Sequence, residues 1–127
     1  MALPEFAVRL LDANTFAVLT TINPDGGPQS SVIWVKREGD EIVFSTILGR
    51  RKTLNMQRDP RISLCLYDPA DPYAYFEARG AVRIGFEGGP ELIQELSQRY
   101  DGQPFTESNP ANVRVVCRLS PAKVVLG

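Results

Sequence analysis

Three consecutive cations stand in the stretch STILGRRKTLNMQRDP, residues 45–60. Arg50, Arg51 and Lys52 fall where a strand is expected to end and a short helix to begin. A helix start already carries unpaired N–H donors and the positive end of the helix dipole, so cations there are unfavourable without a nearby anion. Backbone N–H groups, hydroxyls, a guanidinium and an ammonium group are also the components of phosphate sites. The segment predicts either a phosphate site or a solvated basic patch.

Two other groups of side chains could line such a site. Gln29, Ser30 and Ser31 follow a turn and would offer small donors and acceptors to a planar polar ring, although polarity beside a turn is common. Aromatic residues around DPADPYAYF could stack on a heteroaromatic ring, although core packing is their more common role in β-rich proteins. The polar segment YDGQPFTESNPAN, residues 100–112, could be a lid or an ordinary loop.

Several chemistries are disfavoured by composition. The chain has no histidine, which removes Ser-His and Cys-His nucleophile pairs and His-ligated metals. Cys65 and Cys117 each lie in an apolar strand-like run and are interpreted as reduced core thiols, so no metal site is predicted. A net charge of −1 argues against nucleic-acid and membrane partners. Neither the Walker glycine spacing nor the dinucleotide fingerprint is present.

Length and composition predict one domain over residues 1–127. The chain has 43% apolar and 23% charged residues, as in soluble globular proteins, and contains no apolar run long enough to span a bilayer. The amino-terminal stretch MALPEFAVRLLD contains Glu5 and lacks the basic segment of a secretory signal. A cytoplasmic location is therefore expected.

Local patterns predict three short helices and six to seven strands. Helices are expected from Pro4 to about Asn14, from Arg50 to Arg58 and after Pro90. Asp59-Pro60 should end the second helix, because the residue before proline avoids the helical region. Strands are expected at 15–23, 28–38, 41–48, 61–68, 73–85, 112–120 and 122–127, with the turn Pro-Asp-Gly-Gly joining the first two as a hairpin.

This order of elements favours a mainly β fold. It lacks the strand-helix alternation of a doubly wound sheet, so a small antiparallel Greek-key barrel is predicted. In SSVIWVK, Val32 and Trp34 would occupy one face of the strand, with Ile33 and Val35 on the other. A strand that is apolar on both faces must be covered on both. A homodimer packed through sheet faces is the favoured explanation.

The succession FAVLTTINPDGGPQSSVIWV, a strand ending FST, and GRRKTLNMQRDPRISLCL resembles the flavin- and deazaflavin-binding split β-barrels of the pyridoxamine 5′-phosphate oxidase-like superfamily. Within it, the chain is most similar to small actinobacterial proteins that use the deazaflavin coenzyme F-420. The resemblance covers about residues 6–85, and its most specific part is the R-x-K-T-x-N core that begins at Arg50.

The resemblance implies a set of cofactor-binding residues with different tasks. Those that bind or support the cofactor phosphate are Arg50, Lys52, Thr53 and Asn55. Those that line the ring edge are Gln29, Ser30, Ser31 and Val32. Those that face the ribityl-phosphate side are Ser45 and Thr46. Related proteins are dimers with sites between the subunits, and the residues implied to approach from the second subunit are Tyr73 and Tyr75.

The implied activity is an F-420-dependent oxidoreductase that transfers hydride between the deazaflavin and a small conjugated acceptor. An FMN-dependent oxidoreductase of the same fold and a non-catalytic flavin- or tetrapyrrole-binding protein are the alternatives, and an oligonucleotide-binding barrel is a distant third class. Abundant arginine weakly suggests a G+C-rich genome and favours the deazaflavin, which is common in actinobacteria. Vitamin B6 oxidation is not expected, because the oxidases that perform it use a carboxy-terminal Arg and His.

Overall fold

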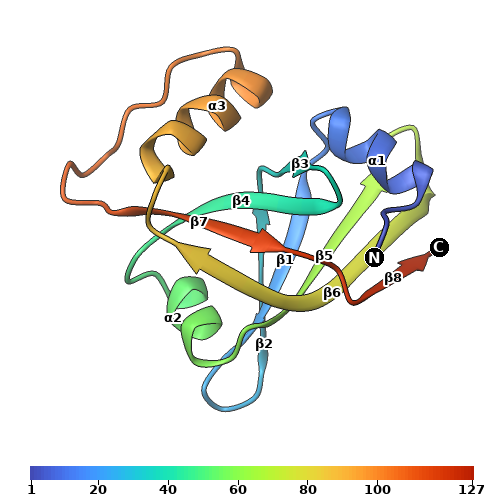
Figure 1. Ribbon diagram of the computed structural model, residues 1–127, viewed down its shortest axis with the longest axis horizontal. Coiled ribbons are helices and arrows are strands. Elements are labelled where there is room, and N and C mark those ends of the chain that lie inside the picture. Colours follow the sequence, from blue (N-terminus) through green and yellow to red (C-terminus); the bar gives the residue numbers. More distant parts are fainter.

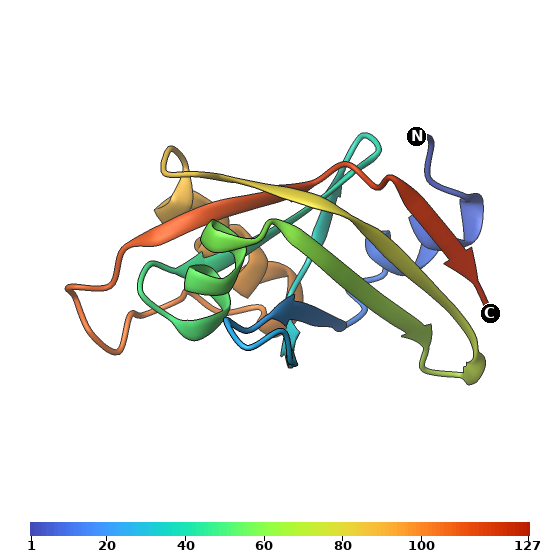
Figure 2. The ribbon, with the colours of Figure 1, turned by 90° about the horizontal axis from the view of Figure 1, so that it is seen from below.

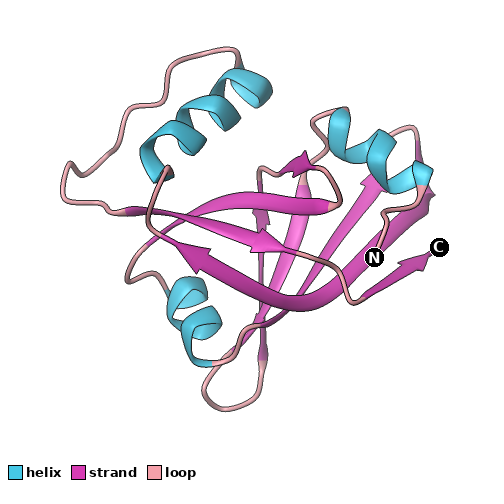
Figure 3. Ribbon diagram, in the orientation of Figure 1, coloured by secondary structure: helices cyan, strands magenta, loops and turns pink.

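The computed structural model describes residues 1–127 and contains three helices and eight strands (Figures 1 and 3). The helices are α1 (Glu5–Asp12), α2 (Arg51–Arg58) and α3 (Gly89–Asp101). The strands are β1 (Ala17–Ile22), β2 (Pro28–Ile33), β3 (Lys36–Glu38), β4 (Glu41–Ile47), β5 (Arg61–Asp68), β6 (Asp71–Gly85), β7 (Arg114–Leu119) and β8 (Lys123–Leu126). The mainly β prediction is confirmed, with one strand more than expected. None of the three helices combines the length and the apolar character that crossing a membrane requires.

The strands form one antiparallel sheet that curls into a half-barrel. Their order is β2-β1-β5-β6-β7-β4-β3, and β8 pairs with β6 beside this path. The 15-residue strand β6 joins the two halves, because its first part pairs with β5 and its last part with β7. Figure 2 shows the resulting curl, with α2 and the two chain termini at opposite ends of the sheet. This curled sheet is the predicted split barrel.

The predicted strand 28–38 is wrong as a single element, because it divides after Ile33. Strands β2 and β3 lie at opposite ends of the strand order, although only Trp34 and Val35 separate them in sequence. Val35 turns into the core, and Trp34 stacks on Tyr100 of α3, with ring centroids 5.5 Å apart. The Tyr100 hydroxyl accepts a hydrogen bond from the Val35 backbone N–H. Helix α3 therefore covers Trp34, whereas Val32 remains 66% exposed.

The interior is filled from the inward faces of nearly all strands. Its largest fully buried side chains include Leu19, Phe44, Leu64 and Phe76, and α1 closes one end with Leu10 and Leu11. A second, smaller apolar cluster lies between α3 and the outer face of β4 and β7: Val43, Leu92, Leu96 and Val116. Burial of these side chains supplies the main stabilisation of the sheet and fixes α3 over β4 and β7.

The two thiols are free but have different surroundings. Cys117 is fully buried in the core, and burial raises its pKa to about 12. Cys65 is half-buried and is not part of the core cluster, so its predicted core location is wrong. The alternation of side chains along β5 explains this, because Leu64 and Leu66 point inward and Cys65 points to the opposite face.

Candidate functional site

Helix α2 begins at the end of β4, where the sequence predicts the phosphate site. Gly49 makes the turn with a φ of 96°, and Arg50 precedes the helix in an extended conformation without a side-chain cap. The Thr53 hydroxyl donates to the Ile47 carbonyl oxygen at 2.7 Å and lies 3.0 Å from the Thr46 hydroxyl. Both threonines are buried, and their hydroxyls bind α2 to β4 within the chain. A direct contact of either with a cofactor stays a prediction.

A second set of hydrogen bonds ties α2 to the β1–β2 hairpin. The amide of Asn55 is fully buried and donates to Thr21 Oγ1 at 3.0 Å and to Asn23 Oδ1 at 2.9 Å. Thr21 in turn donates to Gln29 Oε1 at 3.0 Å. These contacts fix the start of β2 against α2. The implied role of Asn55 as a support is therefore compatible with its position.

Lys52 is the half-buried cation of this region, and it has no carboxylate partner. Its Nζ atom donates to Ser31 Oγ of β2 at 3.2 Å. The ion pairs of the protein include neither Lys52 nor Arg50. Burial lowers the pKa of Lys52, and the positive charge of Arg50 lowers it further. Two neighbouring cations without a counter-ion make this point of the structure favourable for an anion.

A cavity of about 170 Å³ lies beside Lys52. Its polar lining comes from Arg50, Lys52, Ser45 of β4 and Arg114 of β7. Its apolar lining comes from Ile33, Trp34, Ile93, Leu96 and Phe105. No acidic side chain lines the cavity. The chain thus brings three cations together with apolar and aromatic walls, and we call this cavity the α2 cleft.

Arg114 is held at the cleft by contacts on both sides of its guanidinium group. Its Nε and Nη2 atoms donate to the Glu107 carboxylate, and Nη1 lies 3.5 Å from Ser45 Oγ. The Phe105 ring lies against it, with 4.8 Å between the ring centroid and the guanidinium carbon. The hydrogen bond from Arg114 is the main reason that the pKa of Glu107 lies below its ordinary value. The Arg114 side chain is therefore oriented by Glu107, Ser45 and Phe105.

One edge of β2 also faces no other strand. Strand β2 is the terminal strand of the sheet and pairs only with β1. Alternate backbone N–H and C=O groups along its other edge therefore have no partner within the sheet. Ser31 links this strand to Lys52. A ring with donors and acceptors along its rim can bind such an edge.

The other predicted residues are not brought to the α2 cleft within one chain. Ser30 lies on the exposed face of β2, where its hydroxyl is 2.8 Å from Thr20 Oγ1, and Val32 shares that face. Tyr73 and Tyr75 belong to the start of β6, at the end of the sheet opposite α2 (Figure 1). Tyr73 is 87% exposed. Their place in a site therefore depends on a second chain.

Sequence reasoning missed the part of the cleft lining that Arg114, Phe105 and Trp34 contribute. Arg114 is positioned by its pairing with Ile47 across β7 and β4, and Phe105 by the hydrogen bonds of Gln94 to its backbone. The only advance signal was the polar, proline-rich character of residues 100–112, interpreted as a lid or a loop. Trp34 was noticed only as an apolar strand residue. These positions are joined by tertiary packing that local patterns do not encode.

A larger hollow of about 420 Å³ lies on the outer face of β1, β5 and β6. Its two arginines are already neutralised, Arg61 by Asp59 and Arg79 by Glu77. This depression therefore has a different electrostatic character from the α2 cleft. We identify the smaller α2 cleft as the candidate site because two of its three cations, Arg50 and Lys52, take part in no ion pair.

The family model described as pyridoxamine 5′-phosphate oxidase matches residues 3–126. The chain belongs to the pyridoxamine 5′-phosphate oxidase family. An F-420 reductase of known structure is 32% identical and superposes with a TM-score of 0.85, over 97% of this chain and 98% of that one. The conserved hypothetical protein Rv2991 from Mycobacterium tuberculosis is 26% identical, with a TM-score of 0.75 over 98% of this chain and 84% of that one.

A more distant solved structure shows the same fold. HupZ of Group A Streptococcus is 13% identical and has a TM-score of 0.74, over 98% of this chain and 93% of that one. These matches confirm the resemblance to the pyridoxamine 5′-phosphate oxidase-like split barrels. They also indicate a flavin- or deazaflavin-type oxidoreductase fold.

Proposed function

We propose that this chain is an oxidoreductase that binds the phosphate of a flavin-type cofactor in the α2 cleft, with coenzyme F-420 as that cofactor. The observation that carries the proposal is Lys52, a half-buried cation with a lowered pKa and no carboxylate partner. A bound phosphate would supply the missing negative charge and accept hydrogen bonds from Lys52 and Arg50. Charged side chains without partners are costly, so function is the expected reason for such an arrangement.

The residues present also fit the ring of such a cofactor. The free edge of β2 offers backbone donors and acceptors beside Ser31 and Gln29. Trp34 and Phe105 add aromatic surface to the cleft. A cofactor of this class supplies the hydride chemistry itself, toward an acceptor such as an enone or a quinone. The chain's own residues then bind and orient the two partners and keep water from the reacting atoms.

We further propose that the protein is a homodimer whose sites lie between the subunits. The sheet register places Val32, Val18 and Cys65 side by side on the outer face of β2, β1 and β5. Tyr67 and Tyr75 are paired next to them across β5 and β6, and both are exposed. An apolar strip of this kind favours burial against a second copy. Such packing would bring Tyr73 and Tyr75 to the site of the other subunit.

The choice of coenzyme F-420 is supported by the 32% identity to a protein that is an F-420 reductase. FMN is the second candidate, because it presents a phosphate to the same cations. Titration of the purified protein with each cofactor, followed by the emission of the single tryptophan, Trp34, separates them. Tighter saturable binding of F-420 supports the proposal, whereas tighter binding of FMN would identify FMN as the cofactor. Binding of neither contradicts it.

Turnover distinguishes an enzyme from a protein that only holds a cofactor. The reduced cofactor that binds more tightly is mixed with the protein and a panel of enones and quinones, and its oxidation is followed by absorbance. The proposal predicts acceptor-dependent oxidation that increases with enzyme concentration. Binding without turnover by any acceptor in the panel would favour the non-catalytic alternative.

A further inference from the structure

Residues 102–113 connect α3 to β7 and contribute Phe105 to the lining of the α2 cleft. The first part of this segment is fixed to α3, because the Gln94 side chain exchanges two hydrogen bonds with the Phe105 backbone, at 2.7 and 3.0 Å. The Ser97 hydroxyl adds a bond of 2.7 Å to the Gln103 carbonyl oxygen. The part after Phe105 has no regular secondary structure and makes its side-chain link to the sheet through Glu107.

The Glu107 carboxylate occupies the donors of a cleft cation. It accepts hydrogen bonds from Nε and Nη2 of Arg114, whose side chain is only 12% exposed, and from Asn112 Nδ2 at 3.0 Å. The positive charge of Arg50 also acts on this carboxylate and contributes to the lowering of the Glu107 pKa. Glu107 is thus the carboxylate that balances part of the positive charge of the cleft cations.

The size of the cleft makes this contact relevant to binding. A volume of about 170 Å³ is below the range of roughly 300–1,000 Å³ that is usual for small-molecule sites. Phe105 lines the cleft and packs on the Arg114 guanidinium group. Phe105 and the Arg114 side chain that Glu107 holds in place therefore restrict the space beside Lys52 and Arg50.

We propose that Glu107 is an internal substitute for the ligand phosphate. In this structure it accepts the hydrogen bonds of Arg114 that a phosphate would otherwise accept. When a phosphorylated ligand binds, Arg114 exchanges the Glu107 carboxylate for the phosphate. The inference rests on the proposed function, since it needs a phosphate beside Lys52. It adds Arg114 as a phosphate ligand and Glu107 as its competitor.

The opposite role for Glu107 is that of a residue that only orients Arg114 for the ligand. The two roles predict opposite signs for Glu107→Gln, which keeps the shape of the side chain and removes its charge. A competitor lowers the affinity of the wild-type protein, so its removal tightens ligand binding. An orienting residue raises that affinity, so its removal weakens binding.

The test measures dissociation constants for coenzyme F-420 with the wild type, Glu107→Gln, Arg114→Gln and the double variant. We expect about a five-fold or greater tightening by Glu107→Gln, a comparable weakening by Arg114→Gln, and no tightening by Glu107→Gln in the Arg114→Gln background. Glu91→Gln removes the same charge from an exposed position of α3 and should leave the constant unchanged. Circular dichroism verifies that each variant is folded.

Three results would overturn the inference. Weaker binding by Glu107→Gln would make it an orienting residue. If Glu107→Gln tightens ligand binding in the Arg114→Gln background as well, Glu107 acts by long-range repulsion of the ligand and not through Arg114. Equal tightening for the deazaflavin ring with its ribityl chain but no phosphate would show that no phosphate exchange occurs. Each of these leaves the proposed function intact, whereas failure of the wild type to bind either F-420 or FMN removes both.

Discussion

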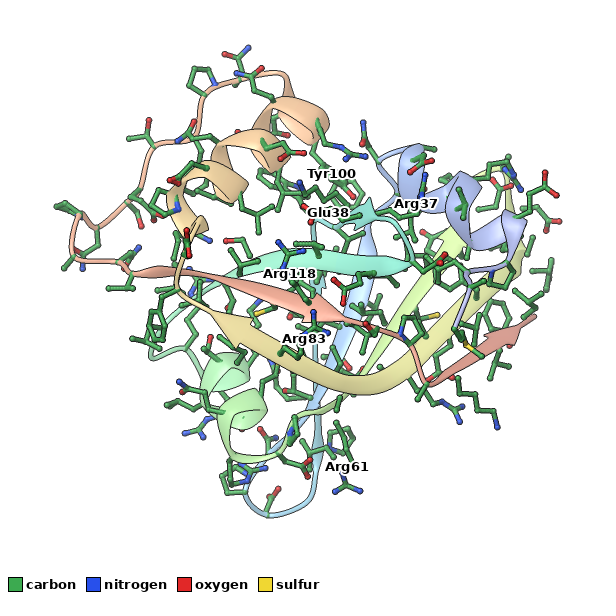
Figure 4. All side chains as sticks on the ribbon, in the orientation of Figure 1. Arg37, Glu38, Arg61, Arg83, Tyr100 and Arg118 are labelled. Carbon is green, nitrogen blue, oxygen red and sulfur yellow. The ribbon has the colours of Figure 1, made fainter.

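Two groups of cations on this protein differ in what balances their charge. On β3, β6 and β7, Lys36, Arg83 and Arg118 are each paired with a glutamate, and Figure 4 shows Arg83, Arg118 and Glu38 on this side of the sheet. At the start of α2, Arg50 and Lys52 have no such partner. Lys36 and Lys52 are both half-buried, so a difference in solvent exposure does not explain why only Lys36 has an acidic partner. The charges of the first group are thus balanced within the chain, whereas Arg50 and Lys52 are the cations that we propose to bind a ligand anion.

The largest expected effect is on cofactor affinity. Lys52→Met removes a charge-assisted contact and should weaken cofactor binding by about 1.5–3 kcal/mol, or roughly 10- to 150-fold. Lys36→Met removes the same charge from the paired group and should leave the dissociation constant unchanged. Titrations of both variants under identical conditions make the comparison. Equal affinity of folded Lys52→Met and the wild type would remove Lys52 from the site.

The next effect concerns how α2 is fixed to β4. Thr53→Val keeps the shape of the side chain but removes the hydroxyl that bonds to the Ile47 carbonyl oxygen and contacts Thr46. The Ile47 carbonyl oxygen keeps the Arg50 N–H as a donor, but the buried Thr46 hydroxyl loses its partner, which should lower the free energy of unfolding by about 1–3 kcal/mol. Urea denaturation measures the loss. No loss of stability would show that the cations of α2 are positioned by some other contact.

The two lysines should also differ in stability, with opposite signs. Lys36→Met leaves Glu38 and Glu95 without their shared partner and should lower stability by about 1 kcal/mol. Lys52→Met removes an unbalanced, half-buried charge and should leave the unliganded protein as stable as the wild type or more stable. Thermal denaturation without cofactor compares the two. A clear loss of stability in Lys52→Met would mean that the chain itself uses this charge.

The dependence of stability on pH in the alkaline range is a smaller effect, and it also distinguishes Lys52 from Lys36. The pKa of Lys52 lies below the ordinary lysine value of 10.5 because of burial and then Arg50. Between the lowered value and 10.5, the unfolded chain binds more protons at this residue, so its contribution to stability rises with pH. Burial opposes the charge of Lys36, but the hydrogen bonds that its ammonium group donates to Glu38 and Glu95 outweigh burial and raise the pKa.

The sign for Lys36 is therefore the reverse. Its contribution to stability is present below 10.5 and is lost as the pH rises through its raised pKa. Denaturation curves of the wild type and both Met variants, recorded over the alkaline range, should show the stability gained by Lys52→Met shrinking with pH. A gain that grows with pH would contradict the pKa direction assigned to Lys52.

The smallest effect is expected in the exposed ion pairs. Glu38→Gln weakens the contacts to Lys36 and Arg118, and its side chain is 40% exposed. Exposed pairs contribute little, so the free energy of unfolding should fall by less than about 1 kcal/mol. Added salt should reduce this difference further. A much larger loss would make this network a major determinant of the fold.

The parts of this structure that sequence reasoning predicted are those with local signals. The Pro24-Asp25-Gly26 turn and the stop of α2 at Asp59-Pro60 depend on backbone preferences of neighbouring residues, and both occur as predicted. The division of β2 from β3 was missed because it follows from the packing of Trp34 on Tyr100, far away in the sequence. For the same reason the cleft was predicted from one side only, with Lys52 but without Arg114.

The central claim is that Arg50 and Lys52, the unpaired cations at the start of α2, bind a cofactor phosphate. The most direct measurement compares the affinity of the wild-type protein for coenzyme F-420 with that for its deazaflavin ring and ribityl chain without phosphate, and repeats the comparison with FMN and riboflavin. The account predicts at least about ten-fold tighter binding of the phosphorylated member of the preferred pair, and a much smaller ratio in Lys52→Met. Equal affinity for both members of each pair would contradict it.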